Sequence, residues 1–458
     1  MNNYTFPIQK NNKMYIYIYE HIKKDILEGK LKKDEKLPSK RVLAKNLNVS
    51  INTIINAYDI LLLEGFIYAK EKKGYFVSDF IGYKYREKNN TINKEIINDE
   101  KYLYDFTTSN IDYSLFPKSI FNSITKDIIY NDESFYHRFG YKGSIELRNQ
   151  IKNLLYMEKN IDVDINQIII GDTTHSLIND IITLLDIKTI MVEDPGYYKK
   201  EKFLINVEYN NVDKKGFNIT EFSLNKAKLG IASSFNEFPL GIKMTMDRKH
   251  EIAKYLDLEN KFLIEDSFDS SFRNNGYQTT PLFNMSNNVI FLESFSRTMF
   301  PGLCISYMVL PKKLVDKYDK LFSIAPKNIS SLDQMILTKF IESGKYASHV
   351  NRLRTSFLNK KKLILQIFNN KYLELVSDNN YSSLLYSISK DIDIILLKQK
   401  LKDNKIKINF INDFKSNKDN EDILILGFSS INLSDINKGL SLLNEIINSS
   451  LKLNKMIK

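Results

Sequence analysis

The stretch Glu293-Ser-Phe-Ser-Arg-Thr-Met-Phe-Pro-Gly-Leu-Cys-Ile-Ser-Tyr307 is a loop with several polar side chains. Apolar runs typical of β-strands lie on both sides of it, at 288–292 and 307–311. A polar loop between two such strands is where an α/β protein usually presents its reactive groups. We therefore expect a functional site at this loop.

Further apolar runs precede this loop and alternate with helical patterns. They lie at 167–170, 189–192, 229–232 and 262–264. Such alternation predicts a mostly parallel sheet with helices on both faces. Because parallel strands bring their loops to the same end of a sheet, a cofactor would bind at that end.

Residues 12–80 show a different pattern, that of three short helices followed by two strands. Apolar residues at helical spacing predict the first helix, and they are Tyr15, Tyr19, Ile22, Ile26 and Leu27. Ser39 and Ser50 are placed as N-caps of the second and third helices, and 65–77 is typical of a two-stranded wing. In a helix-turn-helix, the second helix of the pair offers its N-terminal side chains to the major groove of DNA. Periodicity alone leaves another kind of three-helix cluster open.

Several segments of this region resemble the winged helix of the GntR family, namely Lys36-Leu-Pro-Ser39, Val49-Ser50, Glu64-Gly-Phe-Ile67 and Gly74-Tyr-Phe-Val77. The resemblance implies a domain at 12–80 that binds double-stranded operator DNA. It places a set of residues against the DNA: Ser39, Arg41, Ser50, Asn52, Thr53, Tyr58 and Gly74. Arg41 and the lysines at 32, 33, 36 and 40 suit phosphate contacts. Such domains often carry arginine where this chain has Ile51, so base readout there would be apolar, as against a thymine methyl group.

Composition limits the other possibilities. At 458 residues the chain is long enough for two or three domains, and its net charge of +11 permits a polyanionic partner. A single cysteine excludes an internal disulfide and fits a reducing, cytoplasmic location. No apolar run approaches the roughly 20 residues of a membrane span, so we expect no membrane partner. The polar, charged segment at 81–104 is typical of a linker.

The rest of the chain resembles the fold-type I aminotransferases that depend on pyridoxal 5'-phosphate (PLP), in the version carried by MocR-type GntR regulators. Besides the loop at 293–307, the resemblance rests on Phe139-Gly-Tyr-Lys-Gly143, Glu193-Asp-Pro-Gly-Tyr197, Phe238-Pro-Leu-Gly-Ile242 and Glu265-Asp-Ser-Phe-Asp-Ser-Ser-Phe-Arg273. It implies a multi-domain chain. A winged helix-turn-helix is followed by an α/β large domain at 105–345, which begins with Asp105-Phe106, and by a small α+β domain at 346–458.

The resemblance also implies a cofactor or effector pocket. Its residues would be Thr174, His175, Tyr197, Asp266, Phe268, Ser294, Ser296, Arg297 and Cys304. Asp266 matches the carboxylate that pairs with the pyridine nitrogen of PLP. Without the resemblance, Asp266 would be a hydrogen-bonded loop carboxylate, His175 a structural residue and Cys304 a small buried apolar residue.

Arg297 stands where the resembled family has the lysine that binds PLP covalently. A deprotonated lysine amine attacks the aldehyde of PLP, whereas a guanidinium stays protonated at any biological pH. Cys304 and Phe268 likewise replace the arginine that binds the phosphate and the tyrosine beside the ring. We therefore expect no aldimine and no transamination, with PLP bound non-covalently at most. Arg297 could instead bind a small anionic effector through both of its nitrogens.

These expectations favour a transcription regulator whose aminotransferase-like body dimerises and senses a small molecule. The resemblance implies a homodimer in which each head packs on the partner's body, so that two heads meet paired half-sites on the operator. The sequence leaves two alternatives open. One is a PLP-dependent enzyme that keeps a DNA-binding head, and the other is a body that serves only as a dimerisation scaffold.

Overall fold

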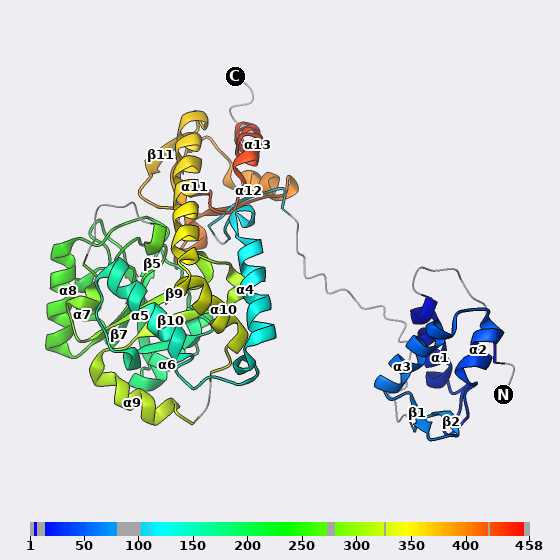
Figure 1. Cartoon of the computed structure of the whole chain (residues 1–458). Helices are drawn as coiled ribbons and strands as arrows, with labels where there is room; N and C mark the ends of the chain where they lie inside the picture. Colours follow the sequence, from blue (N-terminus) through cyan, green and yellow to red (C-terminus); the bar gives the residue numbers. More distant parts are fainter. Residues whose placement is uncertain are drawn as a thin grey trace. The chain divides into compact units, whose positions relative to one another are not determined.

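The computed structural model of the chain describes residues 4–6, 14–79, 102–108, 110–272, 280–324, 327–419 and 422–452. The chain divides into two compact units, a head at residues 1–99 and a body at 100–458 (Figure 1). Most of the predicted linker at 81–104, and Arg273 of the predicted motif, lie outside the described residues. Within those ranges no helix is long and apolar enough to cross a membrane.

The head is a winged helix-turn-helix, as the sequence predicts. Its elements are α1 (Met14–Leu27), α2 (Lys40–Leu47), α3 (Ile51–Leu63), β1 (Ile67–Lys70) and β2 (Gly74–Val77), with β1 and β2 antiparallel. The side-chain oxygen of Ser39 accepts from the backbone N–H of Val42, and that of Ser50 accepts from Thr53, so both caps start their helices where expected. Asn48 ends α2 with a left-handed φ of 52°, which turns the chain directly into α3.

The body contains a seven-stranded sheet in the order β4-β10-β9-β8-β7-β5-β6. The strands are β4 (Ile168–Gly171), β5 (Thr189–Asp194), β6 (Asn206–Asn211), β7 (Leu229–Ala232), β8 (Phe262–Asp266), β9 (Val289–Ser294) and β10 (Ser306–Val309). All pairs are parallel except those of β10, which runs antiparallel to both β4 and β9. The predicted mostly parallel sheet is confirmed. The polar edge strand β6 was not predicted, because it lacks an apolar run.

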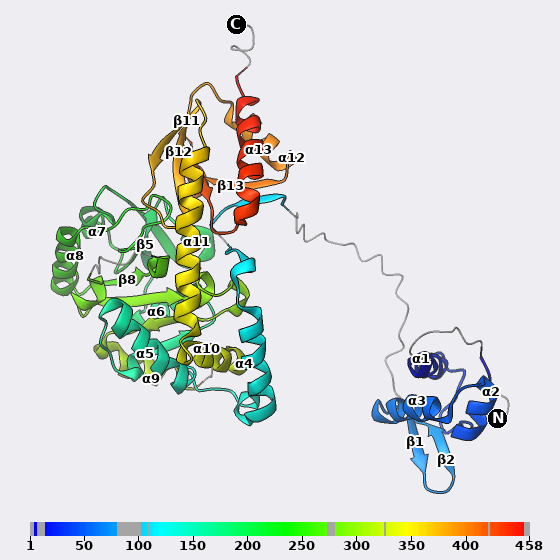
Figure 2. The same cartoon turned by 45° about the horizontal axis from the view of Figure 1, so that its top comes forward.

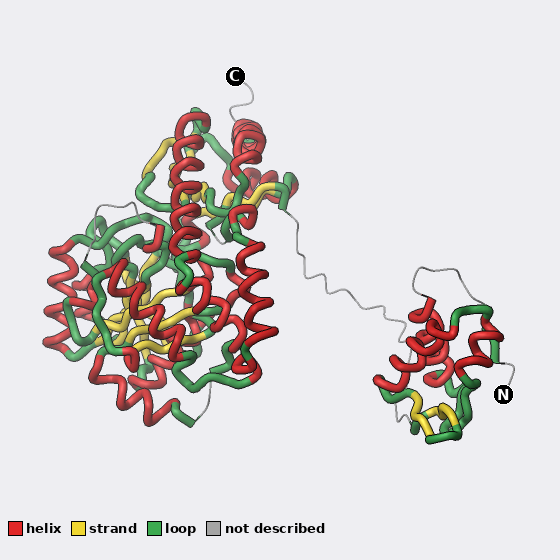
Figure 3. The backbone as a smooth tube through the Cα atoms, viewed as in Figure 1, coloured by secondary structure: helices red, strands yellow, loops and turns green. Residues whose placement is uncertain are grey.

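Helices lie on both sides of this sheet (Figure 3). They are α4 (Lys118–Asn131), α5 (Ile145–Lys159), α6 (Thr174–Leu185), α7 (Ile219–Leu224), α8 (Met246–Glu259), α9 (Lys312–Phe322) and α10 (Ser331–Glu342). Apart from the edge strand β6, the strands are almost wholly buried, as in β4 and β7, where every residue is buried. This double cover explains why the strands appear in the sequence as continuous apolar runs.

A second sheet of five strands has the order β11-β12-β14-β13-β3. Its elements are β3 (Tyr104–Phe106), β11 (Leu373–Ser377), β12 (Ser383–Ile388), β13 (Ile406–Phe410) and β14 (Ile423–Gly427), with helices α12 (Ile394–Asp403) and α13 (Ile436–Asn448). The long helix α11 (Lys345–Ile367) runs from this sheet down alongside the large one (Figure 2).

The position of β3 corrects one expectation. Asp105-Phe106 was predicted to begin the large domain, but β3 pairs in parallel with β13 in the small sheet. Two glycines make room for it: a Cβ on Gly427 would lie 2.5 Å from the carbonyl carbon of Thr107, and one on Gly439 would lie 2.8 Å from the Phe106 ring. The small sheet therefore combines segments from both ends of the body.

Candidate functional site

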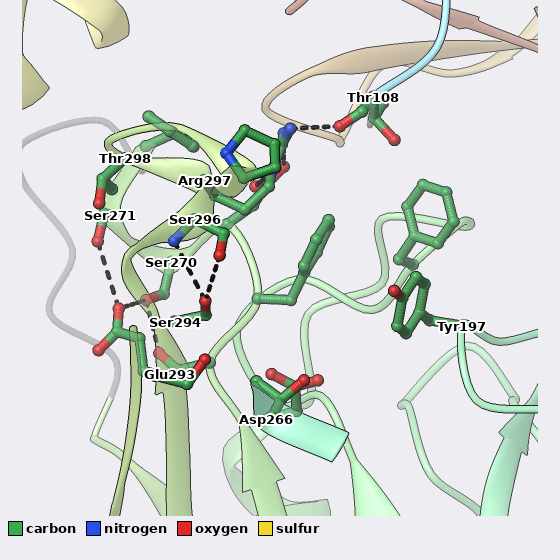
Figure 4. A pocket seen from close by; sticks show the side chains of 18 of the residues that line it. Thr108, Tyr197, Asp266, Ser270, Ser271, Glu293, Ser294, Ser296, Arg297 and Thr298 are labelled. Carbon is green, nitrogen blue, oxygen red and sulfur yellow. Dashed lines mark hydrogen bonds and ion pairs between the residues drawn. The ribbon is translucent and has the colours of Figure 1, made fainter. Parts of the chain in front are cut away.

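A cavity of about 350 Å³ lies at the loops that follow β8 and β9, the end of the sheet where the sequence predicted a site. This volume is near the lower end of the range of roughly 300–1,000 Å³ for small-molecule pockets. Most of the predicted pocket residues line it: Thr174, Tyr197, Asp266, Phe268, Ser294, Ser296 and Arg297. Figure 4 shows Arg297 beside Thr108, and Asp266 well apart from them on β8. Asn409 and Phe414 of the small sheet's region complete the wall.

Two predicted pocket residues, His175 and Cys304, are absent from the described lining of this cavity. The His175 ring packs against Phe203, with ring centroids 4.8 Å apart, which fits its structural interpretation. Cys304 was expected to be buried, and this is wrong because it is exposed. It caps the short helix η8 (Pro301–Leu303) with a left-handed φ of 48°, and its Sγ lies 3.6 Å from the carbonyl oxygen of Pro301.

The guanidinium group of Arg297, which was predicted to bind a ligand, is bonded to other residues of the protein. Its Nε donates to Oδ1 of Asp269 (2.7 Å) and its Nη2 donates to Oδ2 (3.1 Å), a bidentate pair in which the Asp269 side chain is fully buried. Its Nη1 donates to the carbonyl oxygen of Thr108, and its guanidinium carbon lies 5.4 Å from the ring centre of Phe268. The bidentate face expected to bind an anionic effector is therefore occupied. Sequence reasoning missed Asp269, whose role depends on a left-handed φ of 53° that no pattern signals.

Asp266 lies at the end of β8, where the phenolic hydroxyl of Tyr198 donates to its Oδ2 (2.8 Å). Burial raises the pKa of Asp266 to about 6, since a buried carboxylate loses the hydration that favours its charged form. The carboxylate is thus still ionised at neutral pH. Among the described residues it has no lysine or arginine partner. Tyr198 is a second residue that sequence reasoning missed, one position after the predicted Tyr197.

Two more carboxyl groups lie behind Asp266. Glu193 lines a small recess next to the cavity together with Tyr197, Phe238 and Asp266. Burial, together with repulsion from Glu237 and Asp266, raises the pKa of Glu193, and burial raises the pKa of Glu237 to about 8. The Oε1 atoms of both glutamates have no hydrogen-bond partner within the described part of the chain. This side of the cavity is therefore rich in carboxyl groups that lack cationic partners.

The predicted DNA-contacting residues lie at the starts of α2 and α3 and in the wing. Ser39, Arg41, Ser50 and Asn52 are exposed, Thr53 is half-buried, and Gly74 begins β2 with a φ of 106°. Ile51, the first residue of α3, is 46% exposed.

Tyr58 was predicted to face DNA, and this is wrong. It is fully buried in the head, and its hydroxyl donates to the carbonyl oxygen of Pro38 (2.9 Å). It belongs to the inner face of α3 with Ile54, Ala57 and Leu61. Tyr58 therefore holds the segment before α2 in place instead of contacting a base.

Both the head alone and most of the whole chain are similar in sequence to known bacterial transcriptional regulators. The sequence profile described as "Bacterial regulatory proteins, gntR family" matches residues 14–77. The Bacillus subtilis protein "Uncharacterized HTH-type transcriptional regulator YdeL" is 29% identical over 446 residues, covering 93% of this chain and 95% of that protein. The "Probable rhizopine catabolism regulatory protein MocR" of Rhizobium meliloti is 24% identical over 378 residues, covering 77% of each chain. The chain is a MocR-type regulator of the GntR family.

Solved structures similar to this MocR-type chain confirm the fold of its body. An archaeal alanine:glyoxylate aminotransferase superposes with a TM-score of 0.69 at 16% identity, covering 77% of this chain and 93% of that one. The kynurenine aminotransferase of Pyrococcus horikoshii superposes with a TM-score of 0.65 at 16% identity, covering 76% and 91%. The body thus has the predicted fold-type I aminotransferase fold.

This fold implies PLP in the cavity of a MocR-type regulator. The start of α6 is where backbone N–H groups would hold its phosphate. Here Thr173 Oγ1 accepts from the N–H of Ser176 (3.1 Å), and Asp172 Oδ1 accepts from the N–H of Thr173 (2.8 Å). Protein oxygens therefore take these donors, and one of them carries a negative charge. A phosphate at this loop would therefore meet two N–H groups that are already bonded and the nearby carboxylate of Asp172.

The other anchors of PLP are missing as well. The described lining of the cavity contains no lysine, and its one basic residue, Arg297, is paired with Asp269. Of the family's expected anchors, Asp266 is the one in place. The described cavity of this MocR-type regulator therefore does not fit PLP.

Proposed function

We propose that the head of this MocR-type regulator binds operator DNA through the start of α3, with α2 and the wing contacting the sugar-phosphate backbone of the DNA. The proposal rests on the exposed side chains that open the two capped helices, above all Asn52 and Arg41. An asparagine can read adenine in the major groove, whereas an arginine near the backbone supplies charge without reading sequence. Ile51, exposed at the start of α3, suits contact with a thymine methyl group.

The test is DNA binding by the purified full chain. Fragments selected from a random duplex library would supply the operator, and fluorescence anisotropy would give Kd for the selected and a scrambled duplex. Asn52→Ala should reduce the preference for the selected duplex by about 1–3 kcal/mol, and Arg41→Ala should weaken binding to both duplexes and lower the salt slope by about one. Lys24→Ala, an exposed cation on α1 outside the predicted set, is the matched control. Unchanged affinities in both test variants would contradict this DNA-binding surface.

We propose further that the body of this cytoplasmic regulator forms a homodimer that exchanges heads, and that it senses a small molecule without catalysing transamination. Exposed apolar side chains around α4 support dimerisation: Ile129 is 45% exposed, Tyr130 83% and Tyr136 74%. The absence of an aldimine lysine from the described cavity supports a sensor over an enzyme.

Light scattering on the eluting full chain would measure its mass, with Tyr130→Asp as the interface variant and Tyr156→Asp, another exposed tyrosine, on α5, as the control. A dimer that Tyr130→Asp alone dissociates is the expected result. A wild-type monomer at micromolar concentration would contradict the proposal.

A further inference from the structure

The charged groups along the cavity do not balance. Asp269 is paired with Arg297, and Glu293 is paired with the buried Lys159, whose Nζ lies 3.3 Å from Oε1. Asp266 is the third lining carboxylate, and it has only the Tyr198 hydroxyl as its described side-chain partner. The uncompensated charge in the described cavity is therefore negative.

A buried carboxylate without a cation is costly, because its lost hydration is not replaced by an opposite charge. Glu193 adds an unsatisfied acceptor: it is 8% exposed, its Oε1 has no described partner, and it borders the recess that opens beside Asp266. An incoming ammonium group would supply the positive charge that Asp266 lacks and a hydrogen-bond donor for Glu193. An incoming anion would meet Asp266 at short range in a poorly hydrated site, which costs several kcal/mol.

The walls of the cavity favour the same kind of ligand. Tyr197, Phe238, Phe268 and Phe414 line it, and Phe238 meets Phe268 and Phe414 edge to face at 5.6 and 4.8 Å. Aromatic faces attract cations and pack against apolar groups. Two protein cations already use such faces nearby, with Arg297 at 5.4 Å from the Phe268 ring centre and Lys202 at 4.0 Å from that of Tyr197.

We propose that this cavity binds an organic cation, an amine carried on an apolar or aromatic frame, in place of a phosphorylated cofactor. The ammonium group pairs with Asp266 on β8, and the frame packs against Tyr197, both of which are labelled in Figure 4, and against the phenylalanines of the lining. This inference rests on the proposed sensing role of the body and names the chemical class that is sensed.

The test compares three ligands of one shape and different charge: 2-phenylethylamine, 2-phenylethanol and 3-phenylpropionate, with PLP alongside. Isothermal titration calorimetry on the full chain at pH 7.5 should show the amine binding at least about tenfold more tightly than the alcohol, with the acid and PLP weaker still. An amine that binds no better than its alcohol, or an acid or PLP that binds more tightly than the amine, overturns the proposal.

Three variants locate the effect. Asp266→Asn keeps the shape and an acceptor for Tyr198, and it should abolish the preference for the amine. Asp266→Glu should retain the preference, and so should Asp257→Asn, which changes an exposed carboxylate on α8 outside the cavity. A preference that persists in Asp266→Asn would overturn the assignment of this carboxylate.

Operator binding is measured on the same preparations. The DNA-binding function and the ligand class of the cavity can therefore be refuted independently of each other. A chain that binds selected DNA but does not prefer the amine refutes the ligand class alone. A chain that prefers the amine but binds no DNA refutes the regulatory function alone.

Discussion

Replacing Arg297 by glutamine should destabilise the body, because Arg297 neutralises a buried carboxylate and is not a free ligand anchor. The variant loses both charge-assisted bonds to Asp269 and leaves Ser382 Oγ (2.7 Å) as the remaining described side-chain partner. Removing one member of a buried ion pair costs about 3–5 kcal/mol. For a unit that spans residues 100–458, this free energy corresponds to a fall of roughly 4–7 °C in the midpoint.

Differential scanning calorimetry of the full chain would measure the body's transition in Arg297→Gln, in Asp269→Asn and in the double variant. The double variant should be less destabilised than the sum of the two single variants, since it leaves no unpaired charge. Arg352→Gln, an exposed arginine on α11, is the matched control and should change stability by about 0.5 kcal/mol or less. An Arg297→Gln midpoint equal to that of this control would refute the reasoning.

Three other perturbations test separate parts of the account. Asp266→Asn should stabilise the body at pH 8 but not at pH 4. The pKa of Asp266 is raised to about 6, so the wild type loses stability as pH rises from about 4 through 6. Urea unfolding midpoints of the wild type and the variant, measured across this pH range, would show the difference. Tyr58→Phe should cost about 0.5–1.5 kcal/mol through its lost bond to Pro38, and operator preference should not change; calorimetry and anisotropy would separate the two effects. Gly427→Ala should destabilise the small sheet by about 1–3 kcal/mol because its Cβ would overlap the backbone at Thr107, whereas Gly302→Ala, with its nearest neighbour 3.7 Å away, should be tolerated in the same calorimetric assay.

Much of the architecture could be predicted because its signals are local. The caps Ser39 and Ser50 mark the helix starts of the head, and the buried strands β7 and β8 are continuous apolar runs with clear ends. Strands β3 and β6 were harder to place. The pairing of β3 with β13 joins segments about 300 residues apart, and it depends on room left by Gly427 and Gly439, which only the folded structure reveals.

The candidate site was predicted in position but not in chemistry. The motifs at 265–273 and 293–307 predicted that Asp266, Ser294 and Arg297 share one cavity, and all three line it. The function of each side chain then depends on its neighbours, and these come from distant loops: Asp269 holds Arg297, and Tyr198 holds Asp266. Residue type alone suggested that Arg297 binds an anion, whereas the structure gives it a partner within the protein.

The most direct test of the central claim, that this aminotransferase-like cavity does not take PLP, is a PLP titration of the purified full chain. Absorbance would be followed, borohydride added, and the modified lysines mapped by peptide mass analysis. We expect no saturable aldimine band and only scattered, substoichiometric labelling of surface lysines. One lysine reduced to a stable adduct at one equivalent per chain would contradict the account and would restore the interpretation of the body as a PLP-dependent enzyme.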